Sequence, residues 1–156
     1  MAAAYDKYSV SQYSVSSILG YIEAGDIAIP EIQRPFVMFN RRIAPVFGLK
    51  IRGVIWYQGE ADAMFAGGHI YREYLEALIK SYRTHFANDK LPFLVVEIPY
   101  YGSHYIWSDL RDSQRFVANK LDDVHLVSIL DLGDLKDIHP PKKPELGARL
   151  AAVADK

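Results

Sequence analysis

Apolar and polar positions alternate along the carboxyl-terminal two thirds of the chain in a way that predicts strands and helices in turn. Three runs rich in β-branched and aromatic residues predict buried strands: 51–57, 91–98 and 124–130. Apolar residues at helical spacing predict three helices: 67–86, 105–121 and a last helix entered through Pro144, a residue that suits a first turn. This alternation favours a parallel sheet covered by helices on both faces.

The predicted helices each have one apolar face that we expect to pack on the sheet. In the helix over 67–86 it consists of Ile70, Tyr74, Leu75, Leu78, Ile79 and Tyr82, and in the helix over 105–121 of Leu110, Phe116, Val117 and Leu121. Ligands of such sheets bind beyond the carboxyl ends of the strands. The segments that follow residues 57 and 130 are therefore the first places to look for a site.

The amino-terminal residues follow a different pattern. They predict a short helix near 15–23, a turn at Gly25 and Asp26, a brief strand at 27–29 and an extended proline-flanked segment. The pattern changes abruptly near residue 39. We therefore predict two parts, residues 1–38 and residues 39–156.

Composition narrows the class of protein. The 156 residues suffice for one ordinary domain, and a net charge of -1 with 24% charged residues fits a folded protein and gives no basic excess for binding nucleic acid. No apolar run reaches the roughly 20 residues that a membrane helix needs, and the first residues lack a signal-peptide layout. We expect a cytoplasmic protein without a membrane partner. The absence of cysteine excludes disulfides and thiolate metal sites. His69, His85, His104 and His125 match no metal-ligand spacing, and we expect no metal or cofactor.

A histidine follows the third predicted strand in an acidic segment. His139 comes after Asp131, Asp134 and Asp137, with Asp137 the nearest acid. A histidine beside a carboxylate at the carboxyl edge of a sheet is typical of a general base and the group that orients it. The alternative is a loop whose aspartates and prolines only shape the turn and cap the last helix.

The segment "WYQGEAD", residues 56–62, places an amide, a glycine and two carboxylates directly after the first strand. Gly59 allows a sharp turn, Gln58 has an amide that can donate to an oxyanion, and Glu60 and Asp62 can accept from hydroxyls or hold the donors. The alternative is an ordinary loop with a helix-capping acid. We expect Trp56 and Tyr57 to form core and crevice wall.

A third candidate lies within the helix over 105–121. Arg111 and Gln114 are three residues apart and share a helix face, so both side chains can point into one site. A solvated helix face is the alternative. Ser113 has no nucleophile-elbow pattern around it.

Four separated segments together resemble one family. "FNRRIAPVFGLKIRGVIWYQGEADA", "LPFLVVEIP", "WSDLRDSQ" and "DLGDLKDIHPPKKPELGARLA" are similar in order and spacing to the sialate O-acetylesterase-like carbohydrate esterases, a branch of the SGNH hydrolases. The resemblance covers about residues 39–154. It implies a flavodoxin-like three-layer α/β/α fold and a metal-independent serine esterase that removes O-acetyl groups from sugars.

The resemblance also implies roles for residues. His139 matches the family's histidine and Asp137 is the acid of the matching "DIHP", although many relatives place the acid three residues before the histidine, where this chain has Lys136. Asp134 stays an alternative for the acid. Gln58, Gly59 and Glu60 match the block that lines the family's substrate and oxyanion site.

The family's nucleophile belongs to a block upstream of "WYQGE" that these 156 residues do not show. The serines before residue 56 are Ser9, Ser11, Ser14, Ser16 and Ser17, and none follows a glycine-rich turn after a buried strand. We therefore expect a sheet that is incomplete on its amino-terminal side, weak or absent esterase activity, and self-association through exposed sheet surface. A truncated or recombined, non-catalytic chain is the alternative.

Residues 5–37 resemble the start of a ParB/sulfiredoxin-like domain of restriction systems. The motif consists of Ile29, Pro30, Gln33, Arg34 and Val37, followed by Met38 where that family has tryptophan. This resemblance implies a nucleotide- or nucleic-acid-related module as a further alternative. The near-neutral charge counts against it.

Overall fold

The computed structural model describes residues 37–65, 68–102 and 107–155. The chain divides into two compact units, residues 1–50 and 51–156. In the first unit the described residues form a π-helical turn η2 (Phe39–Ile43) and a 3₁₀ turn η3 (Ala44–Val46), with the rings of Phe39 and Phe47 5.6 Å apart. The elements predicted within residues 1–36 lie outside the described residues.

The second unit is built on a parallel sheet of three described strands. They are β1 (Val54–Trp56), β2 (Phe93–Glu97) and β3 (Val124–Ser128), in the spatial order β1-β2-β3. Each strand is shorter than predicted. The flanking residues Leu91, Ile98 and Ile129 are almost fully buried but lie outside the hydrogen-bonded ladder, because apolar character marks burial and not strand pairing.

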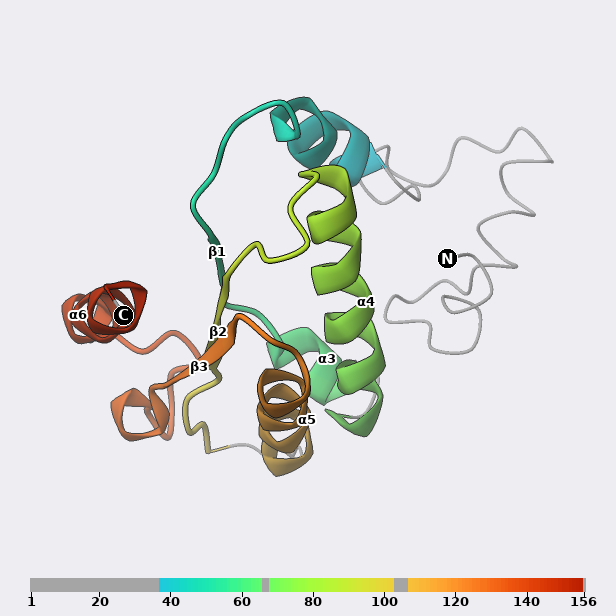
Figure 1. Cartoon of the computed structure of the whole chain (residues 1–156). Helices are drawn as coiled ribbons and strands as arrows, with labels where there is room; N and C mark the ends of the chain where they lie inside the picture. The colour runs from blue at the N-terminus through green and yellow to red at the C-terminus, as the bar shows by residue number, and fades with distance from the viewer. Residues whose placement is uncertain (1–36, 66–67, 103–106, 156) are drawn as a thin grey trace, which may run out of the picture. The chain divides into compact units, whose positions relative to one another are not determined.

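Helices cover both faces of this sheet (Figure 1). On one face lie α4 (Tyr71–His85), preceded by the 3₁₀ turn η4 (Gly68–Ile70), and α5 (Trp107–Lys120). On the other face lies α6 (Lys143–Ala154), whose first turn contains Pro144 as predicted. No helix in the described part of the chain is long and apolar enough to cross a membrane.

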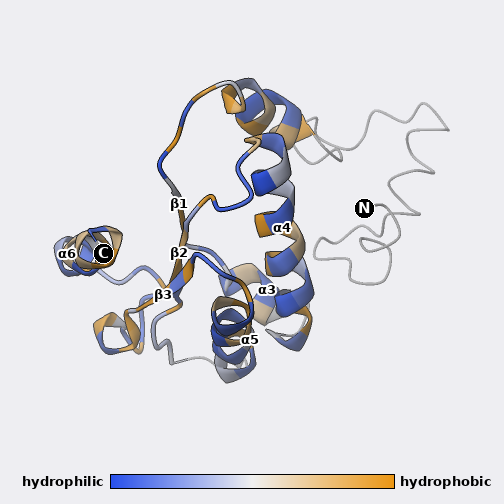
Figure 2. Ribbon diagram, viewed as in Figure 1, coloured by the Kyte–Doolittle hydropathy of each residue, from blue (hydrophilic) through white to orange (hydrophobic). Residues whose placement is uncertain are grey.

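The central strand shows why the fold has three layers. Successive side chains of a strand point to opposite faces. Phe93 and Val95 of β2 belong to the core shared with α4 and α5, whereas Leu94 and Val96 belong to a second core shared with α6. The predicted three-layer α/β/α arrangement is confirmed, and Figure 2 shows β2 as predominantly hydrophobic and α4 as mixed.

The helix faces agree with the prediction only in part. Leu75 and Ile79 of α4 and Leu110 and Val117 of α5 are buried as expected. Phe116, one of the apolar positions of this predicted helix, is 45% exposed and does not belong to the core. Its ring lies instead beneath two cations on the surface, 5.2 Å from the Arg72 guanidinium carbon and 5.8 Å from Lys120 Nζ.

Candidate active site

The chain turns sharply after β1 at Gly59. Gly59 has φ +150°, and a Cβ at this position would lie 2.6 Å from Leu110 Cδ2 and 3.4 Å from Ile98 Cγ2. Its carbonyl accepts a hydrogen bond from Ala63 N at 2.9 Å, which begins the short helix α3 (Glu60–Phe65). The sequence predicted a loop here. Only glycine fits this position without strain or displacement of its neighbours.

A hydrogen-bond network fixes the amide of Gln58. Gln58 Nε2 donates to Asp62 Oδ2 at 2.5 Å, and the Tyr71 hydroxyl lies 3.1 Å from Gln58 Oε1 and 2.9 Å from Gln58 O, so it donates to one of them at a time. Trp56 Nε1 in turn donates to the Tyr71 hydroxyl at 2.9 Å. The expected holding role of Asp62 toward a neighbouring donor is thus visible in its contact with Gln58.

Burial perturbs the titration of two members of this network. Desolvation raises the pKa of Asp62 above its ordinary value of 3.8, and the hydrogen bond from Gln58 opposes that rise. Desolvation also raises the pKa of the Tyr71 phenol, so that Tyr71 stays a neutral donor. The network is therefore held by one buried carboxylate and neutral donors.

Gln114 connects this turn with the end of β2. Its side chain is fully buried; Oε1 accepts from Ile98 N at 3.0 Å, and Nε2 donates to Val96 O at 3.0 Å and to Gln58 O at 3.3 Å. All three partners are backbone groups. Gln114 therefore fastens the first turn of the candidate site to the sheet.

Arg111 lies one helical turn before Gln114, and its side chain is partly buried. Its Nη1 atom is inaccessible to solvent and has no hydrogen-bond partner among the described residues. Arg111 and Gln114 were expected to point together into a site, but neither lines the cleft that contains the other candidates.

The segment after β3 is held in place by two features. Arg149 of α6 binds Asp131 through two hydrogen bonds of 2.6 Å, and this contact lowers the pKa of Asp131 to about 2. Gly133 passes so close to the chain after β2 that a Cβ would lie 2.1 Å from Tyr100 O. Together these contacts fix the start of the loop that leads to His139.

The two acids of this loop have different partners. Asp134 Oδ1 accepts from Lys136 N at 2.6 Å and from Asp137 N at 3.1 Å, so it organises the backbone. Asp137 Oδ1 accepts from His139 N at 2.8 Å and lies 3.5 Å from His139 Nδ1. Of the two acids considered, Asp137 is the one placed beside the imidazole. Both side chains are open to solvent, with 86% of His139 and 62% of Asp137 exposed.

One cleft of about 370 Å³ joins the two segments at the carboxyl ends of β1 and β3. Its lining residues are Tyr57, Gln58, Glu60, Ala61, Ile138, His139 and Lys143. The cleft thus brings His139 together with Gln58 and Glu60, which lie about 80 residues earlier in the chain. Sequence reasoning missed Lys143; the only signal was a pair of lysines at a helix start, where positive charge is normally disfavoured.

No serine lines this cleft among the described residues. Ser113, the one buried serine in residues 37–65, 68–102 and 107–155, donates to Gly68 O at 2.6 Å and lies away from the cleft. In the same part of the chain no group of three or more histidine or acidic side chains is arranged to hold a metal ion.

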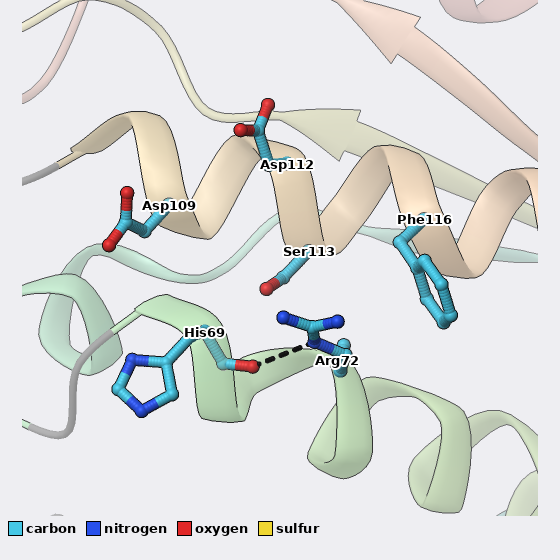
Figure 3. A pocket seen from close by; sticks show the side chains of 6 residues that line it. All are labelled: His69, Arg72, Asp109, Asp112, Ser113 and Phe116. Carbon is cyan, nitrogen blue, oxygen red and sulfur yellow. Dashed lines mark hydrogen bonds between the residues drawn. The ribbon is translucent and has the colours of Figure 1, made fainter.

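A second pocket, of about 270 Å³, lies between the start of α4 and α5 (Figure 3). It is lined by His69, Arg72, Asp109, Asp112, Ser113 and Phe116. Arg72 Nε donates to the backbone oxygen of His69 at 3.0 Å, and none of the predicted site residues takes part. This pocket is formed by helices alone, whereas ligands of parallel sheets bind at the carboxyl ends of the strands.

The described residues thus form a three-layer α/β/α fold with a histidine loop at the carboxyl edge of its parallel sheet. A sequence model of the family "carbohydrate esterase, sialic acid-specific acetylesterase" matches residues 31–156, and the chain belongs to this family. The match includes residues 31–38, which we predicted to belong to the first part. The boundary at residue 39 stays a prediction.

Among solved structures, the chain is similar to a carbohydrate acetylesterase from Xanthomonas citri. The identity is 34% and the TM-score 0.74, over 86% of this chain and 32% of that protein. The chain thus spans about a third of the length of the solved acetylesterase. No curated protein matches the chain.

Proposed function

We propose that this chain carries the base and the substrate wall of a carbohydrate O-acetylesterase, and that these 156 residues by themselves hydrolyse acetylated sugars slowly or not at all. The observation that carries the proposal is the single cleft in which His139 faces the segment of Gln58 and Glu60. Membership of a carbohydrate esterase family supports an acetylated carbohydrate as the substrate class.

His139 acts as the general base in this proposal. A proton on Nδ1, next to Asp137 Oδ1, leaves Nε2 to accept the proton of an attacking hydroxyl. Where a hydroxyl nucleophile is supplied, its oxygen bonds to the acetyl carbonyl carbon, the bond from that carbon to the sugar oxygen breaks, and His139 returns the proton to the departing sugar oxygen. Hydrolysis of the acetyl intermediate by water releases acetate. Asp137 orients the imidazole and stabilises its charged form.

Gln58 acts as an oxyanion donor. One of its two amide hydrogens is used by Asp62, and the other is available to the cleft that Gln58 lines. The bond to a carboxylate and the contacts of Tyr71 hold the amide in one orientation, so little reorganisation accompanies the transition state. Glu60, on the same wall, accepts hydrogen bonds from sugar hydroxyls.

The expectation of slow turnover follows from the lining of the cleft. The described residues place no serine beside His139, and without such a nucleophile a site of this kind keeps on the order of 10³–10⁴-fold acceleration over water at most from binding and oxyanion contacts. The chain is then a catalytically silent part of an esterase site.

The test is hydrolysis of p-nitrophenyl acetate and of an O-acetylated sialic acid by the purified chain and by its His139→Ala variant. We expect equal trace rates for the two proteins. An exposed histidine outside the cleft, His125, provides the matched control His125→Ala. Robust turnover that only His139→Ala abolishes would refute the silent state and would require a nucleophile within this chain.

The nucleotide-related alternative depends on Ile29, Pro30, Gln33 and Arg34, which lie outside the described residues. No observation on the described residues favours it. A cytoplasmic location likewise stays a prediction from the sequence.

A further inference from the structure

Tyr57 and Lys143 stand side by side in the cleft, and the catalysis proposed above uses neither. Lys143 Nζ lies 4.7 Å from the centroid of the Tyr57 ring and 3.4 Å from its hydroxyl oxygen. The first contact is a cation–π interaction and the second a long hydrogen bond that Lys143 donates. The ammonium group is therefore held at a defined place on the wall next to His139.

The position of Lys143 is unfavourable for the helix that it begins. Lys143 is the first residue of α6, where the helix dipole disfavours a positive charge. No carboxylate forms an ion pair with it within residues 37–65, 68–102 and 107–155. Neither the stability of α6 nor an internal ion pair therefore accounts for the positive charge of Lys143 at this position. Binding of an external anion would account for it.

Tyr57 adds a second donor beside the ammonium group. Burial, followed by the charge of Glu60, raises the pKa of Tyr57 to about 12, so the phenol keeps its proton at neutral pH. Its oxygen accepts from Lys143, which leaves the hydroxyl hydrogen for another acceptor. Two adjacent donors, one of them charged, match the two oxygens of a carboxylate.

We propose that Tyr57 and Lys143 form an anion subsite that binds the carboxylate of an acidic sugar and directs the rest of the sugar toward His139. This inference rests on the proposed function, because it assumes that the cleft binds the carbohydrate. Among the residues that line the cleft, Glu60 is the acidic one, and its charge reaches Tyr57. The ammonium group of Lys143 must therefore supply the attraction for an anion.

The test compares the affinity of the chain for N-acetylneuraminic acid and for its methyl ester, which lacks the charge, by titration followed with NMR. We expect the acid to bind about 10-fold more tightly than the ester, as loss of a charge-assisted contact implies. Lys143→Gln should abolish this preference and Lys143→Arg should retain most of it. Tyr57→Phe should reduce it.

Lys142→Gln is the matched control, because Lys142 is the exposed neighbour of Lys143 and does not line the cleft. It should leave the preference for the acid unchanged. Equal affinity for acid and ester in the unsubstituted chain, absence of binding of both, or equal losses from Lys142→Gln and Lys143→Gln would each overturn the subsite. Lys143-dependent binding together with robust acetyl hydrolysis by the unsubstituted chain would instead refute the proposed function and leave the subsite standing.

Discussion

Gln114 offers a direct test of how the site is built, because it is a fully buried polar side chain that is hydrogen-bonded to the backbone of Ile98, Val96 and Gln58. Replacing it with leucine of similar volume leaves Ile98 N–H without a partner in a place that water does not reach, which costs about 1–3 kcal/mol. The carbonyls of Val96 and Gln58 each lose a donor, which adds about 0.5–1.5 kcal/mol apiece. Burial of the additional apolar surface offsets about 1 kcal/mol.

We therefore expect Gln114→Leu to lower the free energy of unfolding by about 1–5 kcal/mol, a large share of the stability of an ordinary domain. Urea denaturation followed by circular dichroism measures this directly. Asp112→Ala on the same helix is the control; its side chain is 72% exposed and its surface ion pair with Arg115 contributes at most about 0.5 kcal/mol. A loss below about 0.5 kcal/mol for Gln114→Leu would refute the view that Gln114 fastens the Gln58 turn to the sheet.

Further predictions concern the turn, pH and assembly. Gly59→Ala should destabilise the fold by about 2–5 kcal/mol through backbone strain and overpacking, whereas Gly147→Ala, in open space on α6, should be neutral or stabilising in the same urea assay. Because the pKa of Asp62 is raised in the folded chain, its contribution to stability is present below pH 3.8 and is lost as the pH rises through the folded pKa. The Asp62→Asn variant should therefore become more stable relative to the unsubstituted chain above about pH 4. A difference in unfolding free energy that stays constant across pH would contradict this. The pKa of Asp131 is lowered to about 2, so its contribution is present above pH 3.8 and lost as the pH falls toward 2, and Asp131→Asn should remove that acid dependence. Among the described residues β1 pairs on one side only, and its Ile55 is 60% exposed. We therefore expect light scattering to show concentration-dependent self-association, which Ile55→Lys should reduce. A strict monomer at all concentrations would count against this.

The fold could be predicted from the sequence to the extent that it depends on local pattern. The alternation of apolar runs correctly indicated three parallel strands and helices on both faces, because period and burial are encoded residue by residue. Strand ends were overestimated, since Ile98 and Ile129 are buried without belonging to the ladder. Helix α3 was missed because it depends on the turn at Gly59 and not on an apolar stripe.

The candidate site was predictable where it follows the ends of strands and not where it depends on packing. Topology placed Gln58 and His139 at the same sheet edge, and the structure puts both in one cleft. The burial of Gln114 and the position of Lys143 over Tyr57 arise from contacts between segments distant in sequence, which no local pattern contains.

The most direct test of the central claim is to map where an O-acetylated sialic acid binds, by chemical-shift changes in isotope-labelled protein. The account predicts changes centred on Gln58, Glu60, His139 and Lys143 at the carboxyl edge of the sheet. Changes centred on His69, Arg72 and Phe116 in the pocket between α4 and α5, or no changes at concentrations that saturate a millimolar site, would contradict it.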